Sequence, residues 1–180
     1  MTIKDHYPLP LISEVVHNLC YACILTKLDI RWRYNNVHFK KGDEDKAAFI
    51  TNHGLFYSLV MVFGLTNSPA TYQVMMNNIF HELINQGHVS VYMDDIMICS
   101  ENLEEHRWTV KHVLAILHKH NLYLKPKKCK FERESVECLG LVVSKGKVEM
   151  DPVKVEGVSK WLTPRTKNEL QQFLGFVNFY

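Results

Sequence analysis

Apolar residues recur along the chain in two alternating spacings, one close to the 3.6-residue turn of a helix and one close to the two-residue repeat of a strand. The helical spacing predicts helices over residues 8–19 and 68–86, from about Asn102, and after Asp151 and Thr166. The strand spacing predicts strands over residues 23–30, 88–100, 138–144 and 147–150, with short β-like pieces between residues 37 and 63. Short turns join several of these strands, so the pattern predicts an α+β fold on a mainly antiparallel sheet.

Capping residues mark the expected ends of the two clearest helices. Ser68 is expected to cap the first helix, Pro69 lies at its first position, and Gly87 ends it. The second helix is expected to start at Asn102, with Glu105 in the position of a capping box. Its expected core-facing residues are Leu103, Val110, Val113, Leu114 and Leu117.

Composition excludes several classes of protein but does not identify a binding partner. Of the 180 residues, 47% are apolar, which is enough for one buried core and argues against disorder. The formal net charge is only +2, so a nucleic-acid interface would have to be a local basic patch. Five cysteines without a regular framework, no signal-peptide pattern and no apolar run of about 20 residues predict an intracellular protein that is neither secreted nor membrane-bound.

The stretch VYMDDIMI, residues 91–98, places two adjacent carboxylates inside an apolar run. Aspartate is common in turns, so Asp94 and Asp95 by themselves fit an ordinary hairpin. A cation site is the alternative, because tight hairpins prefer Asn-Gly or Asp-Gly and because adjacent carboxylates repel each other unless a cation neutralises them. A third acid, Asp29, lies near the end of the strand predicted over residues 23–30. Three such carboxylates can hold two Mg²⁺ ions, but sequence spacing alone leaves both interpretations open.

Five segments of the chain, in this order, resemble the reverse transcriptase of gypsy-type long-terminal-repeat retrotransposons. They are LTKLDIRWRYNNV, VMVFGLTNSPATYQ, VYMDDIMI, LYLKPKKCKF and ECLGLVVS. The resemblance implies a polymerase palm, an antiparallel sheet packed on helices, with partial fingers and the start of the thumb or connection. Residues of about 1–150 would form the palm with partial fingers, and residues of about 151–180 the thumb or connection helices.

The same resemblance implies an RNA-directed DNA polymerase, which is a nucleotidyltransferase. Asp29, Asp94 and Asp95 would hold two Mg²⁺ ions, or Mn²⁺, at its catalytic centre. There the 3′-hydroxyl of a DNA primer attacks the α-phosphate of an incoming dNTP on an RNA or DNA template. Lys128 matches the position proposed to protonate the leaving pyrophosphate, and a solvated basic turn is the alternative for this residue.

Binding residues follow from the resemblance as well. Tyr34 matches the aromatic residue that stacks under the nucleotide sugar, and Phe63 and Gly64 match the loop that lines the nucleotide and template pocket. Leu139 and Gly140 resemble the hairpin that grips the primer end. A core aromatic, an ordinary turn and an apolar strand pair are the respective structural alternatives. The other implied primer or template contacts are Tyr92, Met93, Lys125 and Lys127.

Three positions depart from the family pattern. Arg33 stands where the family commonly has glycine, and its side chain either fills the deoxynucleotide pocket or turns outward to solvent. Tyr57 replaces a usual acid. Cys138 replaces an aromatic residue before Leu-Gly, which would loosen the primer grip.

Both ends of the chain suggest that it is part of something longer. It begins after the first fingers strands of the family and stops at NFY inside a helical pattern. We therefore expect it to work within a Pol polyprotein that also carries ribonuclease H and integrase, in a cytoplasmic virus-like particle or in the nucleus. We expect weak or no polymerase activity from this chain alone. The alternative function is that of an inactive retrotransposon remnant that binds nucleic acid or a partner.

Overall fold

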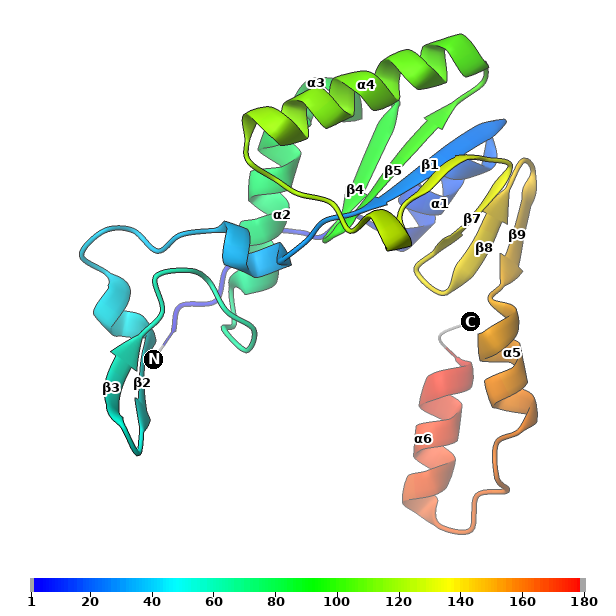
Figure 1. Cartoon of the computed structure of the whole chain (residues 1–180). Helices are drawn as coiled ribbons and strands as arrows, with labels where there is room; N and C mark the ends of the chain where they lie inside the picture. The colour runs from blue at the N-terminus through cyan, green and yellow to red at the C-terminus, as the bar shows by residue number, and fades with distance from the viewer. Residues whose placement is uncertain (1, 179–180) are drawn as a thin grey trace.

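A four-stranded antiparallel sheet forms the centre of the computed structural model, which describes residues 2–178 (Figure 1). Its strand order is β4–β5–β1–β6, with the bounds β1 (Ile24–Asp29), β4 (Val89–Tyr92), β5 (Asp95–Ser100) and β6 (Lys130–Arg133). The two middle strands, β1 and β5, are paired along their whole length, from Ile24 with Ser100 to Asp29 with Asp95.

Each face of this sheet is covered by a different set of elements (Figure 1). One set consists of α2 (Ser68–Ile79), α3 (His81–Asn85) and α4 (Leu103–Lys119). The other consists of α1 (Ile12–Cys20) and a three-stranded antiparallel sheet of β7 (Ser135–Cys138), β8 (Leu141–Ser144) and β9 (Lys147–Met150). Side chains alternate along a strand, so Leu28 and Ile96 enter the first core whereas Leu25 and Met97 enter the second.

Two parts of the chain extend away from the central sheet at opposite ends (Figure 1). One is the hairpin of β2 (Ala48–Thr51) and β3 (Gly54–Tyr57), in which every residue except Thr51 is exposed. The other is the pair α5 (Pro152–Ser159) and α6 (Lys167–Val177), neither of which contains a buried residue. Short 3₁₀ turns complete the chain: η1 (Arg33–Asn36), η2 (Glu44–Ala47) and η3 (Pro126–Lys128). Within residues 2–178 no helix is both long and apolar enough to cross a bilayer.

The helix predicted over residues 68–86 is interrupted. Phe80 leaves the helical conformation, at φ −107° and ψ 15°, and its ring is buried in the core, so α2 ends before it and α3 starts after it. The prediction of Ser68 as cap is wrong, because its buried hydroxyl donates a hydrogen bond to the carbonyl oxygen of Val62 at 3.0 Å and Asn67 is the N-cap. Gly87 follows α3 with a φ of +78°, in line with its predicted role as the end of the helix.

The helix predicted from Asn102 is present as α4, and Asn102 Oδ1 accepts a hydrogen bond from the backbone N–H of Glu105 at 2.8 Å. Of the predicted core-facing residues, Val113 and Leu117 are buried and Val110 is partly buried. The prediction is wrong for Leu103 and Leu114, which are 39% and 37% exposed. The helix instead turns His106 and Thr109 inward, because a hydroxyl on β1 meets the imidazole.

The strand predicted over residues 138–144 is also interrupted, by a turn at Leu139 and Gly140. Both residues have positive φ, +54° and +82°, which ends β7 at Cys138 and starts β8 at Leu141. The two predicted C-terminal helices are present, with Asp151 capping α5 and a complete capping box of Thr166 and Glu169 on α6. The last two residues of the predicted helical pattern, 179–180, lie outside the described residues.

Candidate active site

The hairpin between β4 and β5 is closed by a two-residue turn, Met93–Asp94, since Tyr92 pairs directly with Asp95. Met93 has a φ of +55°, a conformation that costs a non-glycine residue about 1–3 kcal/mol and persists where surrounding contacts fix it. The buried amide of Gln73 supplies such a contact, because its Oε1 accepts a hydrogen bond from the N–H of Met93 at 2.8 Å. The turn is therefore held in a strained shape by α2.

The three predicted catalytic acids are brought together at one end of the central sheet. Asp29 is the register partner of Asp95 across β1 and β5. The carbonyl oxygen of Asp94 accepts a hydrogen bond from the N–H of Ile30 at 3.1 Å, which ties the turn to the end of β1. Thus acids that are 65 residues apart in the sequence (94 − 29) become neighbours through strand pairing.

Each of these carboxylates has a cation beside it. Lys125 Nζ lies 2.5 Å from Asp29 Oδ1, and Lys128 Nζ lies 3.8 Å from Asp29 Oδ2. Lys27 Nζ lies 2.7 Å from Asp95 Oδ2. These basic side chains balance negative charges that would otherwise repel one another at the sheet end.

Asp94 has a looser partner than the other two acids. Arg33 Nε is 3.3 Å from Asp94 Oδ1, which is ion-pair distance, but this buried nitrogen makes no hydrogen bond within the described residues. Burial raises the pKa of Asp95, and the hydrogen bond and charge of Lys27 partly offset this rise.

Three carboxylates are a donor set that suits a hard divalent cation such as Mg²⁺ or Mn²⁺. In the described part of the chain, however, no group of three or more acidic, histidine or cysteine side chains is arranged so that it could hold a metal ion. The carboxylates are instead directed to Lys125, Arg33 and Lys27. The residue types therefore fit a divalent ion, and binding one requires the acids to exchange at least part of these cation contacts.

Known proteins resemble this chain in sequence over most of its length. Residues 1–143 match the family described as reverse transcriptase (RNA-dependent DNA polymerase). The chain belongs to the reverse transcriptase family. Two similar relatives are the transposon Tf2-3 and Tf2-7 polyproteins of Schizosaccharomyces pombe, each 38% identical over 173 residues. These alignments cover 96% of this chain but only 13% of each polyprotein.

Solved reverse transcriptases share the fold. The foamy viral protease-reverse transcriptase in complex with an RNA/DNA hybrid matches 98% of this chain with a TM-score of 0.84 and 22% identity. A dRH form of the foamy viral protein in complex with double-stranded DNA matches 99% with a TM-score of 0.91 and 22% identity. This chain covers 24% and 31% of those two chains. The likeness confirms the predicted palm-type α+β fold.

The predicted sugar-contacting aromatic, Tyr34, is buried beside the Arg33 side chain that pairs with Asp94. Its ring meets Phe63 and Tyr72 edge to face, with centroids 5.0 and 5.8 Å apart. The guanidinium of Arg33 lies over the Tyr34 ring, 4.8 Å from its centroid, and the Arg33 side chain is only 26% exposed. Of the two predicted positions for Arg33, the structure shows the inward one.

The backbone explains why glycine is expected in place of Arg33. Trp32 and Arg33 have φ values of +66° and +37°, a region that glycine enters without steric cost. Gly64, in the predicted pocket loop, also has a positive φ of +92°. Phe63 beside it is 67% exposed even though the edge of its ring touches Tyr34. Of the predicted nucleotide-binding residues, Tyr34 and Phe63 are thus in ring contact, and Gly64 follows Phe63 in the same loop.

The predicted primer contacts occupy two hairpin turns. Tyr92 and Met93 are at the β4–β5 turn, and Leu139 and Gly140 form the β7–β8 turn. Cys138, at the base of the second turn, is buried, and burial raises the pKa of its thiol to about 11. The loosened primer grip that Cys138 implies stays a prediction.

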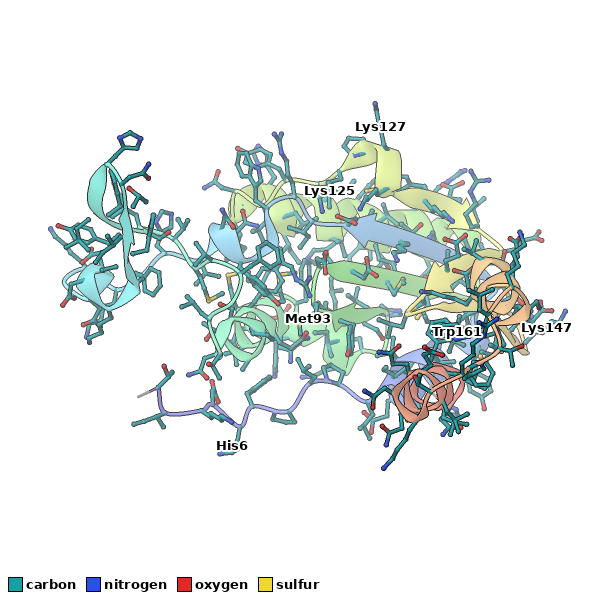
Figure 2. The ribbon with its side chains drawn as sticks, turned by 90° about the horizontal axis from the view of Figure 1, so that it is seen from below. His6, Met93, Lys125, Lys127, Lys147 and Trp161 are labelled. Atoms are coloured by element: carbon teal, nitrogen blue, oxygen red, sulfur yellow. The ribbon has the colours of Figure 1, made fainter. Side chains whose placement is uncertain are left out.

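The predicted basic contacts come from η3 and its N-cap. Lys125 and Lys128 face Asp29, whereas Lys127 projects outward from η3 (Figure 2). Tyr57, the third departure from the family pattern, lies on the exposed hairpin strand β3 and is 54% exposed. It is therefore not part of the cluster around the acids.

Two residues of the site were not predicted from the sequence. Gln73, besides holding Met93, donates from Nε2 to the carbonyl oxygen of Val91 at 2.9 Å and so binds the end of β4 as well as the turn. Lys27 is the partner of Asp95. Their signals were a polar residue on the buried side of an amphipathic helix and a lysine two residues before Asp29 in an apolar strand.

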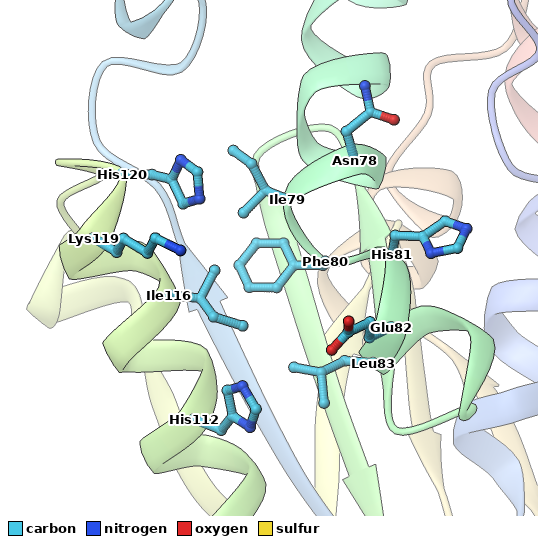
Figure 3. Close-up of a pocket in the computed structure, with 10 residues that line it drawn as sticks. All are labelled: Asn78, Ile79, Phe80, His81, Glu82, Leu83, His112, Ile116, Lys119 and His120. Carbon is cyan, nitrogen blue, oxygen red and sulfur yellow. The ribbon is translucent and has the colours of Figure 1, made fainter.

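A separate hollow lies between the α2–α3 junction and α4 (Figure 3). It has a volume of about 520 Å³. Phe80 and Ile116 form apolar parts of its lining, and His112 and Lys119 line it on the α4 side. None of the three acids lines it, so the candidate active site is defined by convergent charged groups rather than by this cavity.

Proposed function

We propose that this chain forms the catalytic palm of the reverse transcriptase of a gypsy-type retrotransposon, which transfers nucleotides from dNTPs to a primer 3′-hydroxyl. The observation that carries the proposal is the meeting of Asp29, Asp94 and Asp95 at the paired ends of β1 and the β4–β5 hairpin. Membership of the family and the 38% identity to transposon polyproteins support it. We further propose that residues of about 1–150 are the palm with partial fingers and that residues 151–180 begin the thumb or connection.

In the proposed mechanism the three aspartates hold two Mg²⁺ ions, with Mn²⁺ as a substitute. When bound, such ions activate an attacking hydroxyl and neutralise charge on the leaving phosphate of an in-line displacement. The protein itself supplies positioning and charge, which is most of what phosphoryl-type transfer requires. Tyr34 would pack under the nucleotide sugar with Phe63 and Gly64 lining its pocket, and Lys128 would protonate the departing pyrophosphate.

The proposed partners are an RNA or DNA template with a DNA primer. The support is local charge, since Lys128 of η3 and Lys125 at its N-cap lie beside Asp29 in a chain with a net charge of only +2. Leu139 and Gly140 would contact the primer end, and the primer or the template would contact Tyr92, Met93, Lys125 and Lys127. Because the polyprotein relatives are much longer than this chain, we propose that it works as part of a polyprotein that also carries ribonuclease H and integrase segments. We propose that this polyprotein acts inside the cell.

The test is Mg²⁺-dependent primer extension on an RNA template, by this chain and by a longer protein that contains it. The site variant is Asp94→Asn with Asp95→Asn. The matched control is Asp43→Asn with Asp45→Asn, which removes the same two charges near η2, outside the candidate site.

We expect extension by the longer protein and by the control, and none by the site variant. Extension that survives in the site variant would contradict the proposal. If no protein extends, although each is folded and binds primer-template, the chain is an inactive remnant. Comparison of this chain with the longer protein tests the expectation that the chain alone is weakly active.

A further inference from the structure

Lys27 lies between the catalytic acids and the second sheet. It is two residues before Asp29 on β1, so both side chains leave the same face of the central sheet. Its Nζ is 2.7 Å from Asp95 Oδ2 and donates a hydrogen bond to the carbonyl oxygen of Glu137 at 3.2 Å. The side chain is only 18% exposed, which limits the positions that its ammonium group can take.

Glu137 is part of β7, directly before Cys138 and the Leu139–Gly140 turn. The sheet of β7, β8 and β9 shares no strand pairing with the central sheet. Apolar packing of Leu25 and Met97 with Val136 and Cys138 holds the two sheets together, but such packing is not directional. The Lys27 hydrogen bond adds a directional link to this contact, and the link ends on a predicted catalytic acid.

Lys27 is also the cation that lies beside the Asp95 carboxylate. Among residues 2–178 no other cation lies within ion-pair distance of the Asp95 carboxylate. This carboxylate is 20% exposed, so water only partly replaces a lost partner. By contrast, Asp29 has both Lys125 and Lys128.

We propose that Lys27 is a positioning residue that fixes the Asp95 carboxylate and couples it to the turn at Leu139–Gly140. This inference rests on the proposed polymerase function. A shift of the primer-gripping turn would move Glu137, and Lys27 would transmit that shift to Asp95. The primer end and the Asp95 carboxylate would thereby keep the same position relative to each other.

The test uses Lys27→Met, which keeps the length of the side chain and removes its charge and donors, and Lys27→Arg, which keeps both. The control is Lys147→Met, which removes an exposed lysine at the far edge of the second sheet (Figure 2). The first measurement is primer extension by the longer protein, with kcat and the KM for dNTP determined separately. We expect Lys27→Met to lower kcat about 10-fold to 100-fold, the usual loss when an outer partner of a metal ligand is removed, with KM nearly unchanged. Lys27→Arg should recover most of the rate.

The second measurement needs no activity. Hydrogen exchange of the metal-free protein reports the amides of the β7–β8 hairpin, and we expect about tenfold faster exchange in Lys27→Met, as for loss of one charge-assisted hydrogen bond. Lys27→Arg and Lys147→Met should exchange like the parent. Circular dichroism checks the fold of each variant, and if Lys27→Met does not fold, Lys27→Gln replaces it, because it removes the charge but keeps a polar donor group.

The outcomes separate the two proposals. Unchanged kcat and unchanged exchange in a folded Lys27→Met protein would overturn the role of Lys27, and so would a loss of rate with no change in exchange. If the parent does not extend a primer, the polymerase proposal fails, and the exchange measurement still decides whether Lys27 holds the hairpin.

Discussion

The two faces of the central sheet are built from the same strands, yet they carry polar groups in opposite ways. On the face that α2, α3 and α4 cover, which we call the closed face, Thr26 and His106 are fully buried and hydrogen-bonded to each other at 2.7 Å. On the other face, which we call the charged face, the side chains of Lys27, Asp29 and Asp95 form ion pairs and are between 10% and 20% exposed. A closed face can keep polar groups if neutral partners satisfy them, whereas charges need some access to water.

The core on the closed face should contribute far more to stability than the exposed β2–β3 hairpin. Phe80 is 1% exposed in its core, and replacement by alanine should lower the free energy of unfolding by about 3–5 kcal/mol, the usual range for a buried phenylalanine. Phe49 on the β2–β3 hairpin is 52% exposed, so Phe49→Ala should change it by less than about 0.5 kcal/mol. Urea denaturation of both variants measures the difference. Equal losses would mean that the hairpin contributes as much as the core.

The charged face should show the reverse dependence. Asp29→Asn keeps the shape of the side chain and removes the charge between Lys125 and Lys128. We expect primer extension by the longer protein to fall about 10²-fold to 10³-fold, as when one electrostatic group is removed from an active site. Because the two lysines are 35% and 66% exposed, the free energy of unfolding should change by about 1 kcal/mol or less. A large loss of stability with retained extension would assign Asp29 to the fold.

Arg33 contacts both a buried aromatic ring and one of the acids. It covers the ring of Tyr34 and pairs with Asp94, so Arg33→Gly should free the predicted nucleotide pocket and relieve a positive φ. We expect the KM for dNTP to fall about tenfold, since a partly desolvated cation–π contact and an ion pair are each worth about 1 kcal/mol. Arg31→Ala removes a cation that stacks on Trp32 instead and is the control. An unchanged KM would show that Arg33 does not obstruct the pocket.

Local signals account for what could be predicted from the sequence. The strand over residues 23–30, the strand over residues 147–150, a hairpin turn next to the aspartate pair and the start of α4 at Asn102 each depend on neighbouring residues, and all are present. The break at Phe80 could not be predicted, because it depends on a ring entering the tertiary core. The same holds for Leu114, which the helical pattern directed inward although His106 and Thr109 occupy the buried face.

The lysines that pair with the acids were harder to predict than the helices and strands. Lys125 meets Asp29 across 96 residues, and Lys27 meets Glu137 across 110. No local spacing encodes such contacts, since they arise only when η3 and β7 pack against β1. Alternation along β1 does place Lys27 on the same face as Asp29, so part of this arrangement was available in the sequence.

The smallest expected effect concerns the buried polar pair on the closed face. The hydroxyl of Thr26 accepts a hydrogen bond from the N–H of Glu132 at 3.1 Å, so its own hydrogen is available to His106 Nε2. An imidazole that accepts at Nε2 is neutral. Burial lowers the pKa of His106 below its ordinary value of 6.5, and the negative charge of Glu132 opposes this only in part.

The unfolded chain therefore binds a proton at His106 before the folded protein does as the pH falls. Stability from this group is complete above pH 6.5, and it is lost as the pH falls from there through the lowered pKa of the folded state. We expect the urea midpoint to fall between pH 7 and pH 5, and to fall less in His106→Gln. His53→Gln, at the exposed β2–β3 turn, should keep the full dependence. If His106→Gln kept it too, the closed face would tolerate a charge, and the contrast between the faces would not rest on this pair.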